Sequence, residues 1–420
     1  MLKTIRSKLF CILLFLVSVS NAQDTLNIMS YNLLNYSSID GNKGRYIDLR
    51  NIIKNTNPDV MLVCEISSPG APKYLLDSAF NKAGVGTYTR AAFVDGTDTD
   101  NMLFYKTSKV KLRSQKQIAT ALRDISQYLI YKVVATNDTA FLYLHMSHLK
   151  ANTMPSDEAQ RQAEVSAFCS DISSIPQSAN IIFAGDMNFK GSTEAGYVTL
   201  TSSSCSHVFS DPINQPGLWN NNNLFSKIFT QSTRSSANPG CCGGSTGGID
   251  DRFDLMMVTS PIMNGSNKIT YLPGSYKAYG NDNQHMNLSL IDAPTNTVVS
   301  VNVAQSLFNM SDHLPVIMKV VLQPSVIGIK ENKLSQADLN IRGINEGGYS
   351  YLGITASSED HYWMRVIDIA GKEIAALQLE LRAGYQVFDI RKLNLVSGLY
   401  HVILSNENAS SHCLFSKTPD

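Results

Sequence analysis

A set of side chains able to bind metal ions or transfer protons lies at the ends of short apolar runs in this sequence. They are Asn32, Glu65, His148, Asp186, Asn188, Asp254, Asp312 and His313. Carboxylate and amide oxygens suit a hard cation such as Mg²⁺, and a carboxylate beside an imidazole fixes its tautomer and keeps it basic. Each residue alone has an ordinary explanation as a turn, cap or surface group. Because layered α/β folds build their sites at strand ends, the shared position favours one common site.

The elements that must position these residues alternate between strand-like and helical patterns. Apolar or β-branched runs predict strands at 26–31, 60–64, 102–105, 129–135, 141–145, 181–184, 253–258 and 316–321. Apolar residues at helical spacing predict helices around 49–53, 76–83 and 165–172, with Asp157 as the N-cap of the last one. Near-continuous apolar strands are typical of sheets that are covered on both faces, so we predict an α/β fold of packed sheets with helices outside.

Length and charge limit the possible classes of protein. The chain has 420 residues, 43% of them hydrophobic, which predicts two globular units and excludes a disordered chain. It carries 35 Lys and Arg against 35 Asp and Glu. This balance excludes a protein that holds nucleic acid through a strong overall basic field, so a nuclease would have to rely on a local site.

The N-terminal segment has the pattern of a secretory signal peptide. Lys3, Arg6 and Lys8 precede the apolar run 9–19, and small residues stand before position 23. The run has about half of the roughly 20 apolar residues that a membrane-spanning helix needs. We therefore predict a signal peptide at residues 1–22, export, and no transmembrane segment.

The cysteines of the exported chain can oxidise. Cys64 and Cys169 stand in apolar contexts and are predicted to be buried thiols. Cys205 lies in loop-like sequence, as do Cys241 and Cys242, so a disulfide from Cys205 to one of these two is predicted. A zinc cluster is the alternative, but adjacent cysteines lack the usual two-residue spacing of zinc ligands.

A long polar, Gly-rich and Asn-rich segment covers residues 202–250. It is either a tolerated surface insertion or a loop that frames a substrate cleft, and the sequence favours neither.

Several motifs together resemble the endonuclease/exonuclease/phosphatase superfamily, which includes pancreatic-type DNases, apurinic endonucleases, neutral sphingomyelinases and inositol-polyphosphate phosphatases. In the family's order they are Met29-Ser-Tyr-Asn32, Pro58-Asp-Val-Met-Leu-Val-Cys-Glu65, Ser147-His-Leu-Lys150, Gly185-Asp-Met-Asn188, Arg252-Phe-Asp254 and Ser311-Asp-His313. The resemblance covers residues 25–322. It implies a DNase I-like four-layer sandwich of two packed, mostly antiparallel sheets flanked by helices. It also implies phosphoester hydrolysis assisted by a divalent ion.

The resemblance implies a metal site. Glu65 is the first expected ligand, and Asn32 and Asp312 complete the shell directly or through water. The expected ion is Mg²⁺, with Ca²⁺ or Mn²⁺ as alternatives. Asp100 or Asn101 matches a further polar position of the family only loosely.

The resemblance also implies catalytic roles. Asp254 and His313 match the family's carboxylate and imidazole pair, in which His313 takes a proton from water or stabilises the pentavalent phosphorus. Asp186 is the competing base. Asn188 would donate its amide NH to a phosphate oxygen, and His148 would act as leaving-group acid or phosphate donor.

The chain changes character after residue 325. Short strands predicted at 364–369, 374–381, 386–390 and 399–404 suit a small antiparallel β-sandwich. The segments 366–372, 393–402 and 413–417 resemble the C-terminal sorting domain of the type IX secretion system of Bacteroidetes, although the Tyr-Pro-Asn-Pro start is missing. A generic adhesive or carbohydrate-binding sandwich is the alternative. The predicted organisation is a catalytic domain at 23–325 and a sorting domain at 326–420.

These patterns together predict a secreted or cell-surface phosphodiesterase. His148 and the predicted Cys205 disulfide favour an extracellular endonuclease acting on DNA or RNA, with the type IX machinery as a partner. A phosphatase or a sphingomyelinase-like lipid phosphodiesterase of the same fold is the nearest alternative. A non-catalytic surface adhesin is the alternative of another class.

Overall fold

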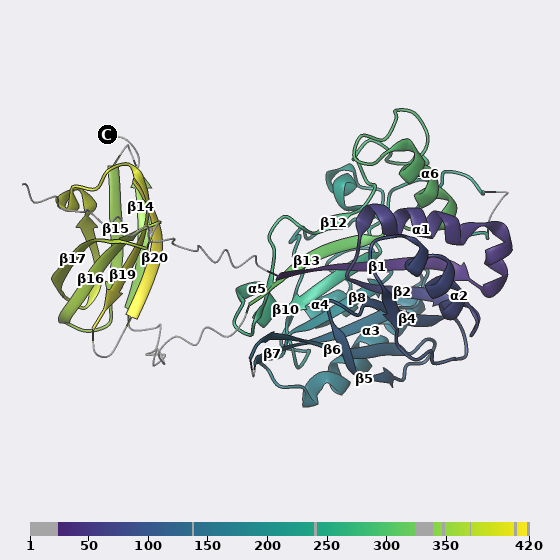
Figure 1. Ribbon diagram of the computed structural model, residues 1–420, viewed down its shortest axis with the longest axis horizontal. Coiled ribbons are helices and arrows are strands. Elements are labelled where there is room, and N and C mark those ends of the chain that lie inside the picture. Colours follow the sequence, from purple (N-terminus) through teal and green to yellow (C-terminus); the bar gives the residue numbers. More distant parts are fainter. Residues whose placement is uncertain are drawn as a thin grey trace, which may run out of the picture. The chain divides into compact units, whose positions relative to one another are not determined.

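The computed structural model describes residues 24–136, 138–238, 242–323, 339–346, 349–369, 371–406 and 410–417. The chain divides into two compact units, one within residues 1–325 and one within residues 326–420 (Figure 1). The predicted signal peptide lies outside the described residues. Within those residues, every helix is too short or too polar to cross a membrane.

Two sheets form the interior of the larger unit. The β1 sheet contains β1 (Asp24–Tyr36), β2 (Val60–Ile66), β3 (Tyr88–Arg90), β4 (Asp100–Lys106), β11 (Ile269–Tyr271), β12 (Lys277–Ala278) and β13 (Val316–Leu322). Its order is β11-β13-β1-β2-β4-β3, and β12 also pairs with β13. The β8 sheet contains β5 (Lys111–Ile118), β6 (Ile125–Ala135), β7 (Asp138–His148), β8 (Ile181–Asp186), β9 (Phe209–Ser210) and β10 (Asp254–Thr259), in the order β5-β6-β7-β8-β10-β9. Among the described strands of these two sheets, β1 with β2 and β7 with β8 pair in parallel, and the other pairs are antiparallel.

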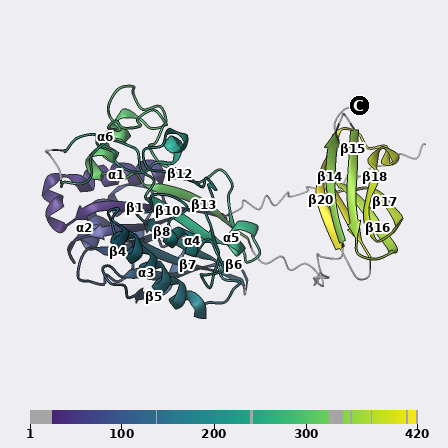
Figure 2. The same cartoon turned by 180° about the vertical axis from the view of Figure 1, so that it is seen from behind.

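Helices cover the outer faces of these sheets (Figures 1 and 2). The α-helices of this unit are α1 (Arg45–Thr56), α2 (Ala71–Ser78), α3 (Pro155–Asp171), α4 (Ala195–Leu200), α5 (Ser260–Asn264) and α6 (Val301–Met310). On the β8 sheet, Phe168 of α3 stacks on Phe183 with ring centroids 4.1 Å apart. On the β1 sheet, the Thr56 hydroxyl at the end of α1 contacts the Met29 sulfur.

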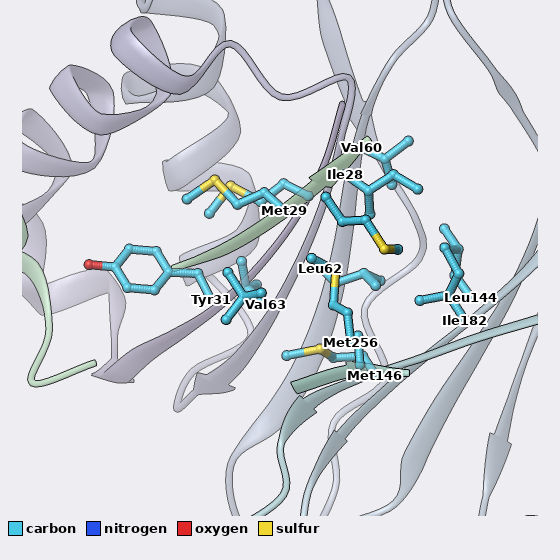
Figure 3. Packing of buried hydrophobic residues seen from close by; sticks show 14 of the residues in the cluster. Ile28, Met29, Tyr31, Val60, Leu62, Val63, Leu144, Met146, Ile182 and Met256 are labelled. Carbon is cyan, nitrogen blue, oxygen red and sulfur yellow. The ribbon is translucent and has the colours of Figure 1, made fainter. Parts of the chain in front are cut away.

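Strand alternation explains how both faces of each sheet become buried. Ile28 and Leu62 of the β1 sheet meet Leu144 and Ile182 of the β8 sheet in the central layer (Figure 3). Met29, one residue from Ile28, points to the opposite face, because successive strand side chains alternate. Burial on both faces accounts for the near-continuous apolar strands. The predicted fold class, packed sheets flanked by helices, is confirmed.

Two helix predictions were wrong in detail. Helix α3 begins at Pro155, and Asp157 is not its N-cap: its carboxylate accepts a hydrogen bond of 3.1 Å from the backbone N–H of the N-cap residue Met154. The helix predicted around 76–83 is instead α2, which ends at Ser78, followed by the 3₁₀ turn Phe80–Lys82.

The disulfide prediction was also wrong. Cys205 pairs with Cys169, at a Cα–Cα distance of 4.9 Å, and Cys242 is disulfide-bonded separately. The chain after α4 returns to the end of α3, where the Ser206 hydroxyl also donates to the Cys169 carbonyl at 2.8 Å. An apolar helix face therefore gave no sign that Cys169 has a disulfide partner. Cys64 is a buried free thiol, as predicted.

In the described residues of the smaller unit, the helices and strands are all β-strands apart from one 3₁₀ turn, Ile390–Leu393. Its strands are β14 (Leu339–Glu346), β15 (Tyr349–Ala356), β16 (Asp360–Asp368), β17 (Glu373–Leu381), β18 (Gly384–Asp389), β19 (Gly398–Ser405) and β20 (Ser410–Lys417). They form two antiparallel sheets, β14-β15-β18 and β17-β16-β19-β20, around one apolar core. The predicted small antiparallel unit is confirmed, and its sorting role stays a prediction.

Candidate active site

The strand order brings the predicted polar residues to one edge of the larger unit. Asn32 and Glu65 lie near the carboxyl ends of the parallel strands β1 and β2. In the β8 sheet, Asp186 is in register with His148 on β7 and with Asp254 on β10. Since β10 and β13 run antiparallel to their neighbours, their first residues meet these carboxyl ends. The turn before β13 adds the last two members of the set, Asp312 and His313.

Local backbone geometry aims several of these side chains. Gly185 has φ +138°, and a Cβ there would lie 1.9 Å from the Ser147 carbonyl oxygen, so only glycine lets β7 and β8 approach this closely. Glu65 and Asn188 have φ of +58° and +53°, a left-handed conformation uncommon for such residues. This conformation turns both side chains out of the regular strand direction at the site, as is typical of functional positions.

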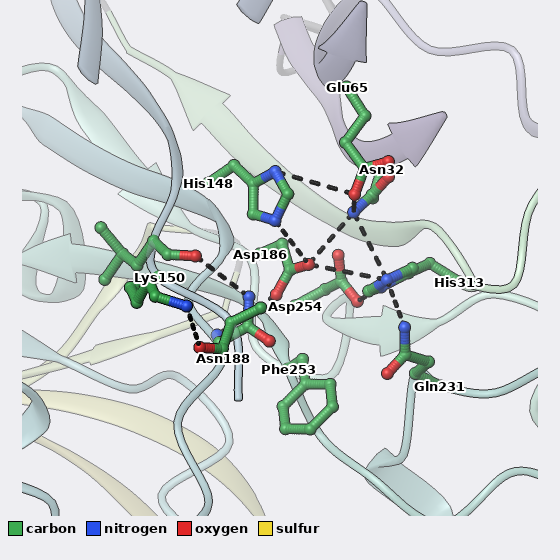
Figure 4. Close-up of polar contacts among 12 residues, drawn as sticks. Asn32, Glu65, His148, Lys150, Asp186, Asn188, Gln231, Phe253, Asp254 and His313 are labelled. Carbon is green, nitrogen blue, oxygen red and sulfur yellow. Dashed lines mark hydrogen bonds and ion pairs between the residues drawn. The ribbon is translucent and has the colours of Figure 1, made fainter. Parts of the chain in front are cut away.

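Glu65, His148 and Asp186 form a cluster with the geometry of a metal site (Figure 4). Their ligand atoms all lie within 4.8 Å of one another. Nδ1 of His148 lies 3.7 Å from Oε1 of Glu65, and its Nε2 lies 3.6 Å from Oδ2 of Asp186. Asn32 joins the two carboxylates by donating from Nδ2 to Glu65 at 2.8 Å and to Asp186 at 3.1 Å.

The electrostatics of this cluster call for a cation. Burial raises the pKa of Glu65 and, together with the nearby Asp254 and Glu65 carboxylates, raises the pKa of Asp186 to about 7. Oδ1 of Asp254, Oδ1 of Asp312 and Nδ1 of His148 are buried and have no hydrogen-bond partner among the described residues. Crowded carboxylates with unused oxygen atoms fit a hard divalent ion such as Mg²⁺.

The predicted ligands differ in how they face the cluster. Glu65 belongs to it. Asn32 turns its amide nitrogen to the carboxylates, while its oxygen accepts from the Leu34 N–H at 2.9 Å, so ligation through that oxygen requires the amide to rotate. Asp312 accepts through Oδ2 from Gln231 Nε2 at 3.2 Å and from Ser245 N–H at 2.6 Å, leaving Oδ1 available.

His313 and Asp254 form a buried pair beside the cluster. Nδ1 of His313 lies 2.7 Å from Oδ2 of Asp254, and its Nε2 points toward Asp186 Oδ2 at 3.5 Å. Although burial lowers the pKa of His313, the Asp254 and Asp186 carboxylates raise it well above its usual value. The ring is therefore held by Asp254 and presents Nε2 to the cleft.

Two further predicted residues border the same cleft. Asn188 donates from Nδ2 to the Leu149 carbonyl at 3.2 Å. Burial and the positive charges of Arg123 and His313 hold the pKa of His148 well below its usual value. The lowered pKa favours a neutral His148 ring, which can donate an N–H hydrogen bond, and its roles as leaving-group acid or phosphate donor stay predictions.

These residues border or underlie a cleft of about 530 Å³. The segment 202–250 frames it through Gln231, Ser232, the loop 244–246 and Asp250, so of the two interpretations left open for this segment the structure favours the framing loop. Most lining side chains are polar, and Leu34, Ala151 and Phe253 are the apolar ones among the described lining residues.

The sequence did not identify several residues of the cleft. Gln231 Nε2 lies 2.6 Å from His313 Nε2, and Nε of Arg123 lies 2.9 Å from Oδ2 of Asp98, which also lines the cleft. Both stand in segments without apolar periodicity, so no sequence signal indicated their position. The loosely matched Asn101 donates instead to the carbonyls of Asp124 and Met146, outside the cleft lining.

Arg252, from the motif Arg252-Phe-Asp254, has a structural position. It is buried and binds Asp211 through two nitrogens, at 2.7 and 3.0 Å. Its guanidinium also lies 4.8 Å from the ring centre of Trp219. This ion pair anchors the start of β10 and hence the position of Asp254.

No family model matches the chain, and no curated protein matches it. Among solved structures, the chain is similar to TDP2 of D. rerio complexed with a single-strand DNA product. The two sequences are 15% identical, the match covers 70% of this chain and 98% of that chain, and the TM-score is 0.45. The human Nocturnin catalytic domain has 15% identity, coverage of 72% and 98%, and a TM-score of 0.44. An endonuclease/exonuclease/phosphatase protein from Beutenbergia cavernae has 12% identity, coverage of 93% and 99%, and a TM-score of 0.43.

Proposed function

We propose that the larger unit is a divalent-metal-dependent phosphodiesterase of the endonuclease/exonuclease/phosphatase type, and that its substrate is DNA or RNA. The observation that carries this proposal is the pairing of His313 with Asp254 at 2.7 Å beside the Glu65, His148 and Asp186 cluster. Acidic oxygens for a cation and a held imidazole are the two parts that hydrolysis of a phosphodiester needs in one cleft.

Each residue then has a role that follows from its charge. Glu65 and Asp312 would hold a Mg²⁺ ion, together with Asn32 after rotation of its amide; the bound ion would neutralise phosphate oxygens. His313, whose pKa is raised by Asp254 and Asp186, suits the stabilisation of negative charge at phosphorus. This favours Asp186 over His313 as the acceptor of the proton from the attacking water.

The lining of the cleft supports a water-soluble substrate. Leu34, Ala151 and Phe253 are its few apolar residues among those described, whereas Arg123 and Lys190 add two positive charges to the lining. A nucleic acid therefore fits this cleft better than a phospholipid.

The test uses the full chain with plasmid DNA, RNA, sphingomyelin and inositol phosphates in Mg²⁺, Ca²⁺, Mn²⁺ or EDTA. We expect cleavage of DNA or RNA that EDTA abolishes, and a loss of roughly 10²–10⁴-fold in Glu65→Gln and His313→Asn. Glu158→Gln, an exposed carboxylate on α3, is the matched control. Unchanged activity in the two site variants would refute the mechanism, and activity on lipid alone would refute the nucleic-acid substrate.

We also propose that the protein is exported and that residues 326–420 direct it through the type IX machinery. The disulfide between Cys169 and Cys205 supports an oxidising compartment. Deleting residues 330–420 should retain the protein in the periplasm with unchanged specific activity. An inactive truncated enzyme, or one that still reaches the medium, would contradict the sorting role.

A further inference from the structure

Lys190 stands on a firmly held backbone two residues after Asn188. Its N–H donates to Oε2 of Glu194 at 3.1 Å, and its carbonyl accepts from the Trp219 N–H at 2.9 Å. Glu194 itself forms a buried ion pair with Arg161. The start of the Lys190 side chain is therefore fixed relative to the candidate active site.

The ammonium group of Lys190 rests on an aromatic ring inside the cleft. Its Nζ lies 4.5 Å from the ring centre of Phe253, and both residues line the cleft. Phe253 directly precedes Asp254, and its carbonyl accepts from the Met187 N–H at 2.8 Å. Figure 4 shows the Phe253 ring next to Asn188 and Asp254, so the ammonium that rests on this ring lies at the candidate active site.

The hydrogen-bonding capacity of this ammonium is unused. Lys190 Nζ forms an ion pair with Oδ1 of Asp251, but at 3.7 Å this contact is too long for a hydrogen bond, and that oxygen already accepts from Asn220 Nδ2 at 2.8 Å. Within the described part of the chain, Lys190 Nζ has no hydrogen-bond acceptor. The other cation of the cleft, Arg123, contacts Asp98 at 2.9 Å and donates to the His148 carbonyl. Lys190 is therefore the cation best able to accept a new anionic partner.

We propose that Lys190, held over Phe253, forms a subsite for a second phosphate of the substrate, on the Asn188 side of the phosphate that is cleaved. This inference rests on the proposed function and sharpens it, because a subsite of this kind selects a chain with successive phosphates. The substrate class is therefore an oligonucleotide or longer nucleic acid, rather than an isolated phosphodiester.

The test compares two substrates that differ in their number of phosphates. Bis(p-nitrophenyl) phosphate carries one, and a short single-stranded DNA carries several. For Lys190→Gln with Mg²⁺ we expect kcat/KM on the small diester to stay within about 2-fold of the wild type. On the oligonucleotide, kcat/KM should fall about 10-fold through a rise in KM. The slope of log KM against log salt concentration should become smaller by roughly 0.7, because one phosphate contact is removed.

Two further variants control this experiment. Lys116→Gln removes a lysine on β5 that forms an ion pair with Asp171 at 2.6 Å. This variant should leave kcat/KM unchanged on both substrates. Phe253→Leu keeps an apolar side chain but removes the ring under the ammonium, and it should reproduce part of the oligonucleotide defect. Thermal unfolding checks that each variant remains folded.

The outcomes separate this inference from the proposed function. Equal loss on both substrates, or no loss on either, would overturn the subsite while leaving a phosphodiesterase. A wild-type protein that hydrolyses the small diester but no oligonucleotide would overturn both the subsite and the nucleic-acid substrate, and would leave only the phosphodiesterase activity. A wild-type protein that hydrolyses neither substrate in any divalent metal would overturn the proposed function and this inference with it.

Discussion

Removal of the Cys169–Cys205 disulfide is expected to destabilise the larger unit by about 4 kcal/mol. The two cysteines are separated by 36 residues, and cross-linking such a loop lowers the entropy of the unfolded chain by about 13 cal/mol/K in the loop-closure model. At 25 °C this entropy corresponds to about 4 kcal/mol. Both side chains are buried, so substitution of both by alanine also leaves a small unfilled volume and adds to the loss.

The assay follows urea unfolding through Trp219. This residue is fully buried in the larger unit, whereas Trp363, in the smaller unit, is 53% exposed. The chain has 2 tryptophans, so a Trp363→Phe background makes Trp219 the only tryptophan reporter. Cys169→Ala combined with Cys205→Ala is then compared with Cys413→Ser, which removes a free thiol from the smaller unit. Variants are preferable to reducing agents, because Cys242 is disulfide-bonded as well.

The free energy of unfolding of the double variant should fall by about 4 kcal/mol, while the Cys413 variant leaves the Trp219 transition unchanged. A loss below about 1 kcal/mol would refute the loop-entropy reasoning, because the unfolded chain would then be restricted by something other than this bond.

Three further predictions concern other parts of the larger unit. Gly185→Ala should lower the free energy of unfolding of the larger unit by at least about 3 kcal/mol in urea, because the added Cβ would lie 1.9 Å from the Ser147 carbonyl oxygen. A loss under about 1 kcal/mol would contradict the close approach of β7 and β8. Burial lowers the pKa of His285, but hydrogen bonds to Asp282 and to two carbonyls raise it above its usual value. The positive charge of His285 therefore stabilises the folded protein fully below about pH 6.5. This contribution to the free energy of unfolding is lost as the pH rises through the raised pKa. Unfolding measured from pH 5.5 to 8.5 should show this loss in the wild type and a flatter profile in His285→Gln. Mg²⁺ at 100 times its dissociation constant should raise the free energy of unfolding of the wild type by about 2.7 kcal/mol. The same Mg²⁺ concentration should stabilise the Glu65→Gln variant less. Equal stabilisation of the wild type and the variant would place the ion away from Glu65.

Local patterns were enough to predict the longer buried strands of the two sheets, but not β5, whose side chains are mostly exposed or half-buried. A strand buried on both faces must be apolar along its whole length, and residues 181–184 therefore stood out without any knowledge of their neighbours. Helix ends were less predictable, because several polar residues near a start compete for the cap. At α3 the pattern indicated Asp157, but the helix begins earlier and Asp157 supports the N-cap from the third helical position.

Contacts between distant segments were beyond the local patterns. Cys169 lies on a helix face whose apolar neighbours are typical of a buried thiol, and only the return of the chain places Cys205 against it. Gln231 likewise belongs to a polar segment with no period, yet its amide contacts both Asp312 and His313. The motif residues stood out because they lie in or beside apolar strand patterns, whereas Gln231 lies in a segment without such a pattern.

The balanced charge of the whole chain differs from the charge inside the cleft. The whole chain has no formal net charge, but the cleft of the candidate active site brings Glu65, Asp186 and Asp312 together around His313. Such a cleft repels a phosphate until a cation compensates the carboxylates, since a bound divalent ion is the largest local charge in its site. Near-neutral composition and a polyanionic substrate are therefore compatible, provided that the bound metal supplies the positive charge and Lys190 extends it along the substrate.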